Sequence, residues 1–250
     1  MTDRRAAFIT GASGGVGYAL CAAFRSAGYS VIATDQIGAI EPECDLFIPL
    51  DLEELVSDPI GQDALVGEVV AHLSAVRAGL GCLINNAAIQ ITADLDALDV
   101  HSFERSHRVN VTAPFLLAKI FGPYLRSSGG GIVNIGSVHS RLTKKGFCAY
   151  SASKAGLAGL TRALAMEFGA DVTVNTITPG ALDTPMLQAG FSGAPEKLGF
   201  LESHHPIGRI GQPDEIASMA VFLASDAARF VTGAELPVDG GVSARLHDPG

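Results

Sequence analysis

A serine, a tyrosine and a lysine in this chain have the residue types and spacing that can move a proton to or from an alcohol. Tyr150 and Lys154 are four residues apart, so on a helix they share one face. A phenol, with a pKa of about 10, is a poor base at neutral pH, but a nearby ammonium favours the phenolate and lowers that pKa. Ser137 can hold the substrate oxygen while the phenolate takes its proton. The set predicts general acid–base chemistry at an alcohol or carbonyl oxygen.

A glycine-rich segment near the N-terminus has the composition of a phosphate-binding turn. Residues 10–17 read Thr-Gly-Ala-Ser-Gly-Gly-Val-Gly. Glycines allow a tight turn and let a pyrophosphate approach a helix N-terminus, where free N–H groups favour anions. The alternative is a plain glycine-rich turn.

Asp35 ends the apolar run that follows this turn. A carboxylate there can accept hydrogen bonds from a ribose diol and would repel a 2′-phosphate. We therefore predict NAD rather than NADP as the cofactor. The alternative is that Asp35 simply ends a strand in water.

Apolar strands alternate with helical patterns along the chain. The strands lack an apolar–polar alternation, which indicates a sheet covered on both faces, and their alternation with helices indicates parallel βαβ units. We expect an α/β fold, a doubly wound parallel sheet of about seven strands with helices on both faces. The expected strands are 6–10, 30–35, 46–50, 82–86, 132–136, 172–178 and 235–238. The expected helices are about 16–27, 62–78, 102–126, 150–168 and 213–224.

The chain is expected to form a single domain over residues 1–250. The Gly/Ser-rich stretch 127–131 is interpreted as a helix C-cap and turn, because a strand follows it at once. Within the stretch 181–210, residues 189–206 contain Gly, Pro and His and show weak helical periodicity. We expect them to form a substrate flap and not a linker.

Composition excludes several classes of protein. Of 250 residues, 48% are hydrophobic and 17% are charged, which is too apolar for disorder, and no apolar stretch is long enough to span a membrane. The net charge of −9 argues against nucleic acid or an anionic membrane as partner. Cys21 and Cys82 have apolar neighbours, which suits buried free thiols in a reducing cytoplasm. The apolar run after Arg4 and Arg5 is too short for a signal peptide.

On these motifs the sequence resembles the short-chain dehydrogenase/reductase family, in its short single-domain branch. The resemblance covers essentially the whole chain and implies a Rossmann-like fold. The matching pieces are Thr10–Gly17, Asp35, Asp51-Leu52, Asn85–Ala88, Asn110, Ser137, Tyr150–Lys154, Pro179–Thr184, Phe222–Asp226 and Val238–Gly241.

The resemblance implies a role for each matching residue. Tyr150 is the expected acid/base, Ser137 the anchor of the substrate oxygen, and Asn110 the support of a water that relays the proton. Lys154 is expected to hold the ribose hydroxyls and to tune Tyr150. The other expected cofactor contacts are Gly11, Ser13, Gly15 and Val16 at the phosphates and ribose, Asp51 and Leu52 at the adenine, Asn86 and Ala87 on the adenosine side, and Leu182 and Thr184 at the nicotinamide. Without the resemblance, Asn110 is a polar residue inside a helix, and Thr184 is an ordinary helix N-cap.

The sequence departs from the family pattern at two places. The family's N-N-A-G appears as N-N-A-A and ends in Ala88, which places one methyl near the nicotinamide side. Only fifteen residues separate Asp35 from Asp51, too few for a full crossover helix, so we expect a turn and a more exposed adenosine end.

Candidate substrate residues follow the fifth strand, the N-N-A segment and the start of the flap: Gln90, His139, Arg141, Leu182 and Met186. His139 could bind a hydroxylated or anionic substrate, or it could simply pair with a backbone carbonyl. Arg141, Lys144 and Lys145 could attract an anionic substrate, although a solvated loop is the plainer reading. His204 and His205 lack further ligands at metal-site spacing, so we predict no metal.

The leading hypothesis is an NAD-dependent oxidoreductase of secondary alcohols, polyols or sugars, or of the matching ketones. The alternatives are an NADPH-dependent carbonyl reductase, which Asp35 disfavours, and a non-catalytic cofactor-binding regulator, which the intact Ser-Tyr-Lys-Asn set disfavours. The resemblance further implies a homotetramer built on the two helices rich in Ala, Gly and Leu, 102–126 and 150–168. Small residues on those helices could instead pack only against the sheet.

Overall fold

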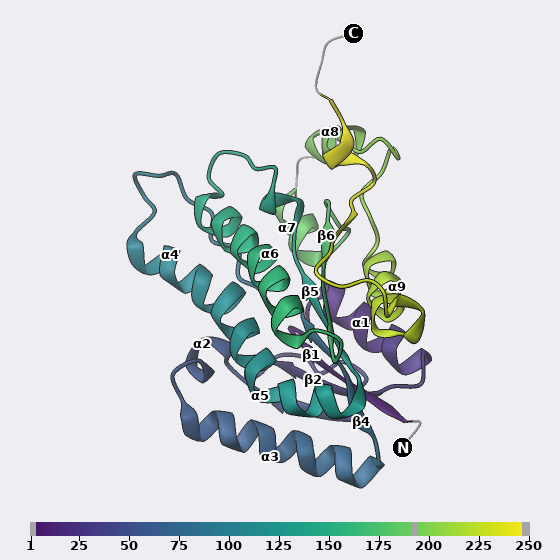
Figure 1. Ribbon diagram of the computed structural model, residues 1–250. Coiled ribbons are helices and arrows are strands. Elements are labelled where there is room, and N and C mark those ends of the chain that lie inside the picture. The colour runs from purple at the N-terminus through teal and green to yellow at the C-terminus, as the bar shows by residue number, and fades with distance from the viewer. Residues whose placement is uncertain (1–3, 192–194, 247–250) are drawn as a thin grey trace.

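The computed structural model describes residues 4–191 and 195–246 and shows one seven-stranded parallel sheet between two layers of helices (Figure 1). The strand order is β3-β2-β1-β4-β5-β6-β7. The order reverses between β1 and β4, and ligands of such sheets bind in the crevice at the carboxyl ends of the strands there. The strands are β1 (Arg5–Thr10), β2 (Ser30–Asp35), β3 (Leu46–Pro49), β4 (Gly79–Asn85), β5 (Gly131–Ile135), β6 (Thr173–Pro179) and β7 (Glu235–Val238).

Helices cover both faces of this sheet, which confirms the predicted fold class. The helices are α1 (Gly15–Ser26), α2 (Leu52–Leu55), α3 (Pro59–Val76), α4 (Val100–His107), α5 (Ala113–Ser128), α6 (Cys148–Phe168), α7 (Pro185–Gly190), α8 (Pro195–His204) and α9 (Pro213–Ala224). Within the described residues, no helix is long and apolar enough to cross a membrane.

Two hydrophobic clusters hold the layers together. Successive strand residues point to opposite faces, so Ala6 and Phe8 of β1 pack with α3, α5 and α6, whereas Ala7 and Ile9 pack with α1 and α9 (Figure 1). All four side chains are fully buried. Strands buried on both faces need apolar residues at every position, which explains why the sequence shows no alternation.

The helix predicted over 102–126 is interrupted in its N-terminal half. A π-helical turn, Arg108–Thr112, separates α4 from α5. Single π-helical turns inside α-helices are frequent at functional sites. Here the turn contains Asn110, whose buried amide bonds to backbone atoms of Ile89 outside the helix. A hydrophobic pattern cannot reveal this insertion, because it depends on a tertiary hydrogen bond.

The crossover between β2 and β3 has the expected form, whereas the segment after β6 is more helical than predicted. Residues 36–45 contain no helix, which confirms the short crossover between β2 and β3. The expected flap contains two helices, α7 and α8, although its helical periodicity is weak. α8 lies above the carboxyl edge of the sheet beside the C-terminal chain (Figure 1). Both helices begin at a proline, a residue that favours the first helical position.

Two cysteines are buried free thiols, as the sequence predicts. Cys21 on α1 and Cys82 on β4 lie in the cluster between the sheet and α9. Burial raises the pKa of Cys21 to about 12 and raises that of Cys82 as well. A thiol must ionise to react, so both residues have a packing role.

Candidate active site

The glycine turn between β1 and α1 requires glycine at two of its positions, Gly11 and Gly17. Gly11 has a φ of +64°, and a Cβ on it would lie 2.7 Å from the Cα of Ala87. A Cβ on Gly17 would lie 2.1 Å from the carbonyl oxygen of Gly11. The turn therefore folds tightly onto the start of α1 and against the end of β4.

Asn86 holds the same turn from the neighbouring strand end. Its side-chain amide donates to the carbonyl oxygens of Gly11 at 2.8 Å and Thr10 at 3.0 Å. The Thr10 hydroxyl oxygen in turn accepts from the backbone N–H groups of Asn86 and Ala87, both at 3.0 Å. The two residues expected on the adenosine side of a cofactor thus also shape the turn that faces it.

Two features of this turn fit a dinucleotide phosphate. The N-cap residue of α1, Gly14, makes no side-chain cap, so the N–H groups of the first helical turn are available to an anion. The Ser13 hydroxyl oxygen is buried and has no hydrogen-bond partner among the described residues. Buried hydroxyls are normally bonded, and a phosphate oxygen would supply the missing partner.

Asp35 lies beside the turn at the carboxyl end of β2. Its carboxylate accepts from the backbone N–H of Ser13 at 2.8 Å and from that of Gln36 at 2.8 Å. The negative charge is therefore fixed next to the expected phosphate site. Asp51 caps α2 through the Glu53 N–H at 2.8 Å, and Leu52 packs into the core under that helix.

Lys154 and Tyr150 come together on α6, as their spacing predicts. The Lys154 Nζ lies 5.6 Å from the centroid of the Tyr150 ring and donates to the carbonyl oxygen of Ile135 at 2.7 Å. Lys154 is only 3% exposed. Because burial penalises the ammonium, the pKa of Lys154 is lowered to about 8.

The protonation of Tyr150 differs from the sequence expectation. Burial raises the pKa of Tyr150 above its usual value, and hydrogen bonding with Ser137 offsets only part of that rise. The lowered pKa expected from the neighbouring ammonium is therefore wrong for this structure, because desolvation of the phenolate is the larger effect. Tyr150 rests as a neutral phenol that can donate a proton.

Asn110 is buried and fully engaged with groups around Tyr150. Its Nδ2 donates to the Ile89 carbonyl and to the Ser153 hydroxyl, both at 2.9 Å, and its Oδ1 accepts from the Ile89 N–H at 2.9 Å. The Ser153 hydroxyl then donates to the Tyr150 carbonyl at 2.8 Å. The sequence analysis did not name Ser153 as a site residue. Its position directly before Lys154 was the available signal for this role.

Known proteins with similar sequences and structures are oxidoreductases. The protein-family model described as enoyl-(acyl carrier protein) reductase matches residues 11–243. An acetoacetyl-CoA reductase of Rhizobium meliloti is 35% identical over 246 residues, covering 95% of this chain and 98% of that protein. The ligand-free aldohexose dehydrogenase of Thermoplasma acidophilum superposes with a TM-score of 0.89 at 30% identity, covering 99% of this chain and 97% of that one. A putative 2-deoxy-D-gluconate 3-dehydrogenase of Agrobacterium tumefaciens with bound NADP superposes with a TM-score of 0.83 at 30% identity, covering 98% of both chains.

The chain belongs to the short-chain dehydrogenase/reductase family. It is accordingly an oxidoreductase that transfers hydride between a nicotinamide cofactor and a small-molecule alcohol or carbonyl compound. The Ser137, Tyr150, Lys154 and Asn110 side chains occupy one region of this dehydrogenase/reductase, at the carboxyl ends of β4 and β5.

Around Tyr150 this short-chain dehydrogenase/reductase has an aromatic wall. The His139 ring stacks on Phe147 with centroids 4.5 Å apart and meets the Tyr150 ring edge-on at 5.7 Å. Burial, with a smaller contribution from the charge of Lys144, lowers the pKa of His139. The backbone N–H of His139 donates to the Ser137 hydroxyl oxygen at 3.2 Å. His139 therefore lies beside Ser137 and Tyr150 as a neutral ring.

The start of the flap lies against the glycine turn. A Cβ on Gly15 would lie 3.1 Å from Cγ2 of Thr184, whose hydroxyl oxygen accepts from the Leu187 N–H and caps α7. Leu182 forms an isolated β-bridge with Gly211 at the base of the flap. Gln90 is exposed at the opposite rim, and the side chain of Met186 on α7 lies outside the described part of the structure.

Arg141 is engaged within the protein. Its guanidinium pairs at 2.6 Å with Glu235 on β7, whose carboxylate also pairs with Arg162 on α6 at 2.8 Å. Lys145 lies 3.5 Å from Asp94, and the Lys144 ammonium lies over the Phe147 ring. Arg141 uses Nε and one Nη group on Glu235, which favours a role as an anchor of the loop after Ser137.

We expect Arg141→Gln to raise KM by about threefold, and by the same factor for neutral and anionic substrates. The buried Glu235 carboxylate keeps its pair with Arg162, and the variant removes no charge that contacts the substrate. Steady-state kinetics on one neutral alcohol and its carboxylate analogue would test this. A rise confined to the anionic substrate would instead assign Arg141 to substrate binding.

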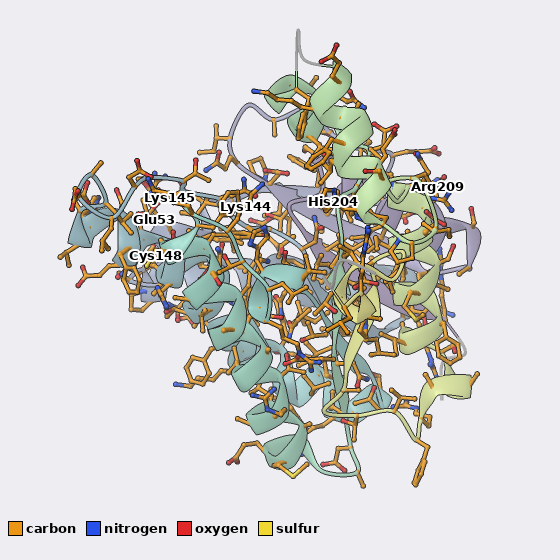
Figure 2. All side chains as sticks on the ribbon, turned by 90° about the horizontal axis from the view of Figure 1, so that it is seen from above. Glu53, Lys144, Lys145, Cys148, His204 and Arg209 are labelled. Carbon is orange, nitrogen blue, oxygen red and sulfur yellow. The ribbon has the colours of Figure 1, made fainter. Side chains whose placement is uncertain are left out.

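The histidine pair shows no metal-site geometry. Among residues 4–191 and 195–246, no three His, Cys, Asp or Glu side chains converge as metal ligands. Figure 2 shows His204 at the end of α8 and Arg209 on the chain that follows. Arg209 makes a bidentate pair with Glu215, which lowers the pKa of that carboxyl to about 2.

Proposed function

We propose that this protein is an NAD-dependent dehydrogenase that oxidises a secondary alcohol, polyol or sugar or reduces the matching ketone. The observation that carries the proposal is the Asp35 carboxylate, fixed 2.8 Å from the Ser13 N–H beside the phosphate turn. A ribose diol can donate to it, whereas a 2′-phosphate would be repelled. The turn from Thr10 to Gly17 offers no arginine or lysine to offset that repulsion.

The proposed cofactor contacts follow from this placement. Gly11, Ser13, Gly15 and Val16 face the phosphates, Asp35 the adenosine ribose, Asp51 and Leu52 the adenine, Asn86 and Ala87 the adenosine side, Tyr150 and Lys154 the nicotinamide ribose, and Leu182 and Thr184 the nicotinamide. When bound, the nicotinamide supplies the hydride acceptor or donor. The unpartnered Ser13 hydroxyl and the uncapped N-terminus of α1 support this assignment.

Side chains of the protein transfer the proton to and from the substrate oxygen. In reduction, the neutral Tyr150 phenol donates its proton to the substrate oxygen, while the Ser137 hydroxyl holds that oxygen. In oxidation the phenolate takes the proton back, and the Lys154 ammonium near the ring stabilises it. Asn110, through Ile89 and Ser153, fixes the backbone around Tyr150.

We expect Asp35→Ser to shift the ratio of kcat/KM for NAD over NADP toward NADP by about tenfold, because the repulsion of the 2′-phosphate and the ribose contact are both lost. The measurement is nicotinamide absorbance with each cofactor. Glu41→Gln removes an exposed carboxylate from the same connection and should leave the ratio unchanged. A wild-type protein that prefers NADP would favour the second candidate, an NADPH-dependent carbonyl reductase, which the NADP-bound structural relative supports.

The substrate is proposed to meet Gln90, His139, Leu182 and Met186, with Arg141 as the less favoured contact. A panel of secondary alcohols, polyols and aldoses, with and without an anionic group, tests the substrate class. Turnover of neutral members alone would assign specificity to the flap and the aromatic wall. Binding of NADH without any turnover would support a non-catalytic regulator.

We further propose that residues 1–250 form one domain that assembles as a homotetramer in the cytoplasm. The outer faces of α5 and α6 carry exposed Phe115 and Met166, 47% and 75% exposed, which a second copy of the chain could cover. Light scattering of the purified protein is expected to give the mass of four chains. A monomer at micromolar concentration would contradict the assembly.

A further inference from the structure

His205 is a buried histidine that the proposed reaction does not use. It is 3% exposed and follows the last residue of α8. Its Nδ1 lies 3.0 Å from the carbonyl oxygen of Leu201, and its Nε2 accepts from the backbone N–H of Ala181 at 3.3 Å. A carbonyl only accepts and an amide only donates, so the ring is held as the neutral tautomer with its hydrogen on Nδ1.

The ring lies at a junction of three chain segments. A Cβ on Gly180 would lie 3.0 Å from its Nε2, and a Cβ on Gly240 would lie 3.5 Å from its Cβ. Close by, the Ile207 N–H donates to the Gly240 carbonyl at 3.2 Å. His205 therefore fills the space between the exit of β6, the C-terminal chain and the returning end of the flap.

This junction sets the start of the flap. The Gly211 N–H donates to the Ala181 carbonyl at 2.9 Å, and the Asp183 N–H donates to the Gly211 carbonyl at 2.8 Å. Both backbone groups of Ala181 are thus satisfied, one by His205 and one by Gly211. The next residues lead to Thr184, which caps α7 and touches the glycine turn at Gly15.

We propose that His205 is a positioning residue that couples α8 to the loop Gly180–Thr184, and through this loop to the nicotinamide side of the site. A hydrocarbon side chain could fill the same space, but it would leave the partly buried Ala181 N–H without its acceptor. The loop would then move to reach water, and its contacts with the cofactor would weaken. This inference rests on the proposed role of Leu182 and Thr184 in holding the nicotinamide.

Three variants separate acceptor loss from loss of packing. In His205→Gln a side-chain oxygen can reach the position of Nε2, whereas in His205→Asn the amide reaches only the position of Nδ1. His205→Leu loses both groups. We expect the Leu and Asn variants to raise the cofactor KM by about tenfold with kcat changed less than about threefold, and the Gln variant to stay within about threefold of wild type.

Hydrogen exchange of the peptide containing Ala181 gives a readout that does not need turnover. Exchange at this peptide should accelerate in the Leu and Asn variants and stay slow in the Gln variant. His204→Leu is the matched control, since His204 bonds the Phe200 carbonyl at 2.7 Å one residue earlier on α8. That control should leave exchange at Ala181 unchanged.

The outcomes separate this inference from the proposed function. Equal behaviour of the Gln and Asn variants, in exchange and in KM, would show that His205 only packs and would overturn the inference. This comparison remains decisive even if the Leu variant does not fold. If the wild type turns over no alcohol at all, the exchange pattern still decides the positioning role, and NADH titration by fluorescence still shows whether cofactor affinity follows it.

Discussion

Tyr150→Phe is expected to lower kcat by about 10²–10⁴-fold, the range that general acid–base catalysis contributes. The phenol is the group that exchanges a proton with the substrate oxygen, and Phe keeps the ring that packs against His139 while removing only the hydroxyl. Ser137 would still hold the substrate oxygen, but no group would remain to supply or take its proton. NADH affinity, measured by fluorescence titration, should therefore stay within about threefold of wild type.

Tyr124→Phe on α5 is the matched control, because it deletes a phenol hydroxyl in the core layer away from the site. Its kcat should equal that of wild type. Full activity of the Tyr150→Phe enzyme on every substrate of the panel would remove Tyr150 from the mechanism and leave the dehydrogenase proposal without its acid/base.

The sequence predicts the elements whose limits depend on local chemistry. The strands 30–35 and 235–238 and the helix 213–224 have the predicted bounds, because apolar runs end at polar residues and Pro213 starts the helix. The π-helical turn and α8 were missed. The first depends on the hydrogen bonds between Asn110 and Ile89, and the second is a short helix with a weak apolar pattern.

Some features of the candidate site could also be predicted from the sequence, and others could not. Spacing alone brings Tyr150 and Lys154 onto one helix face, and the structure places them there. The raised pKa of Tyr150 was not predictable, since it depends on burial that only the packed fold defines. The ion pair of Arg141 with Glu235 was hidden for a similar reason: 94 residues separate the partners, and neither belongs to a motif.

The order of the two pKa values at the site predicts the pH dependence of the enzyme. Lys154 has a pKa of about 8, and Tyr150 has a pKa raised above its usual value, so the lysine loses its proton first. Reduction needs the neutral phenol and the ammonium, so kcat/KM for the cofactor should be constant at low pH and fall as pH rises through about 8. Oxidation needs the phenolate with the ammonium. Its kcat/KM should rise tenfold per pH unit up to about 8, then level off, because loss of the lysine proton cancels the gain of phenolate.

Lys154→Met tests this assignment and is expected to lower kcat/KM by about 10²-fold, because a charge-assisted contact to the cofactor ribose and the stabilisation of the phenolate are both lost. The break near pH 8 should disappear in both directions, and oxidation should keep rising with pH until Tyr150 itself ionises. Lys119→Met on α5 serves as the matched control and should keep the wild-type profile. A break that stays near pH 8 in the Lys154→Met enzyme would assign that ionisation to another group. The charge of Lys154 would then not control whether Tyr150 is protonated during the reaction.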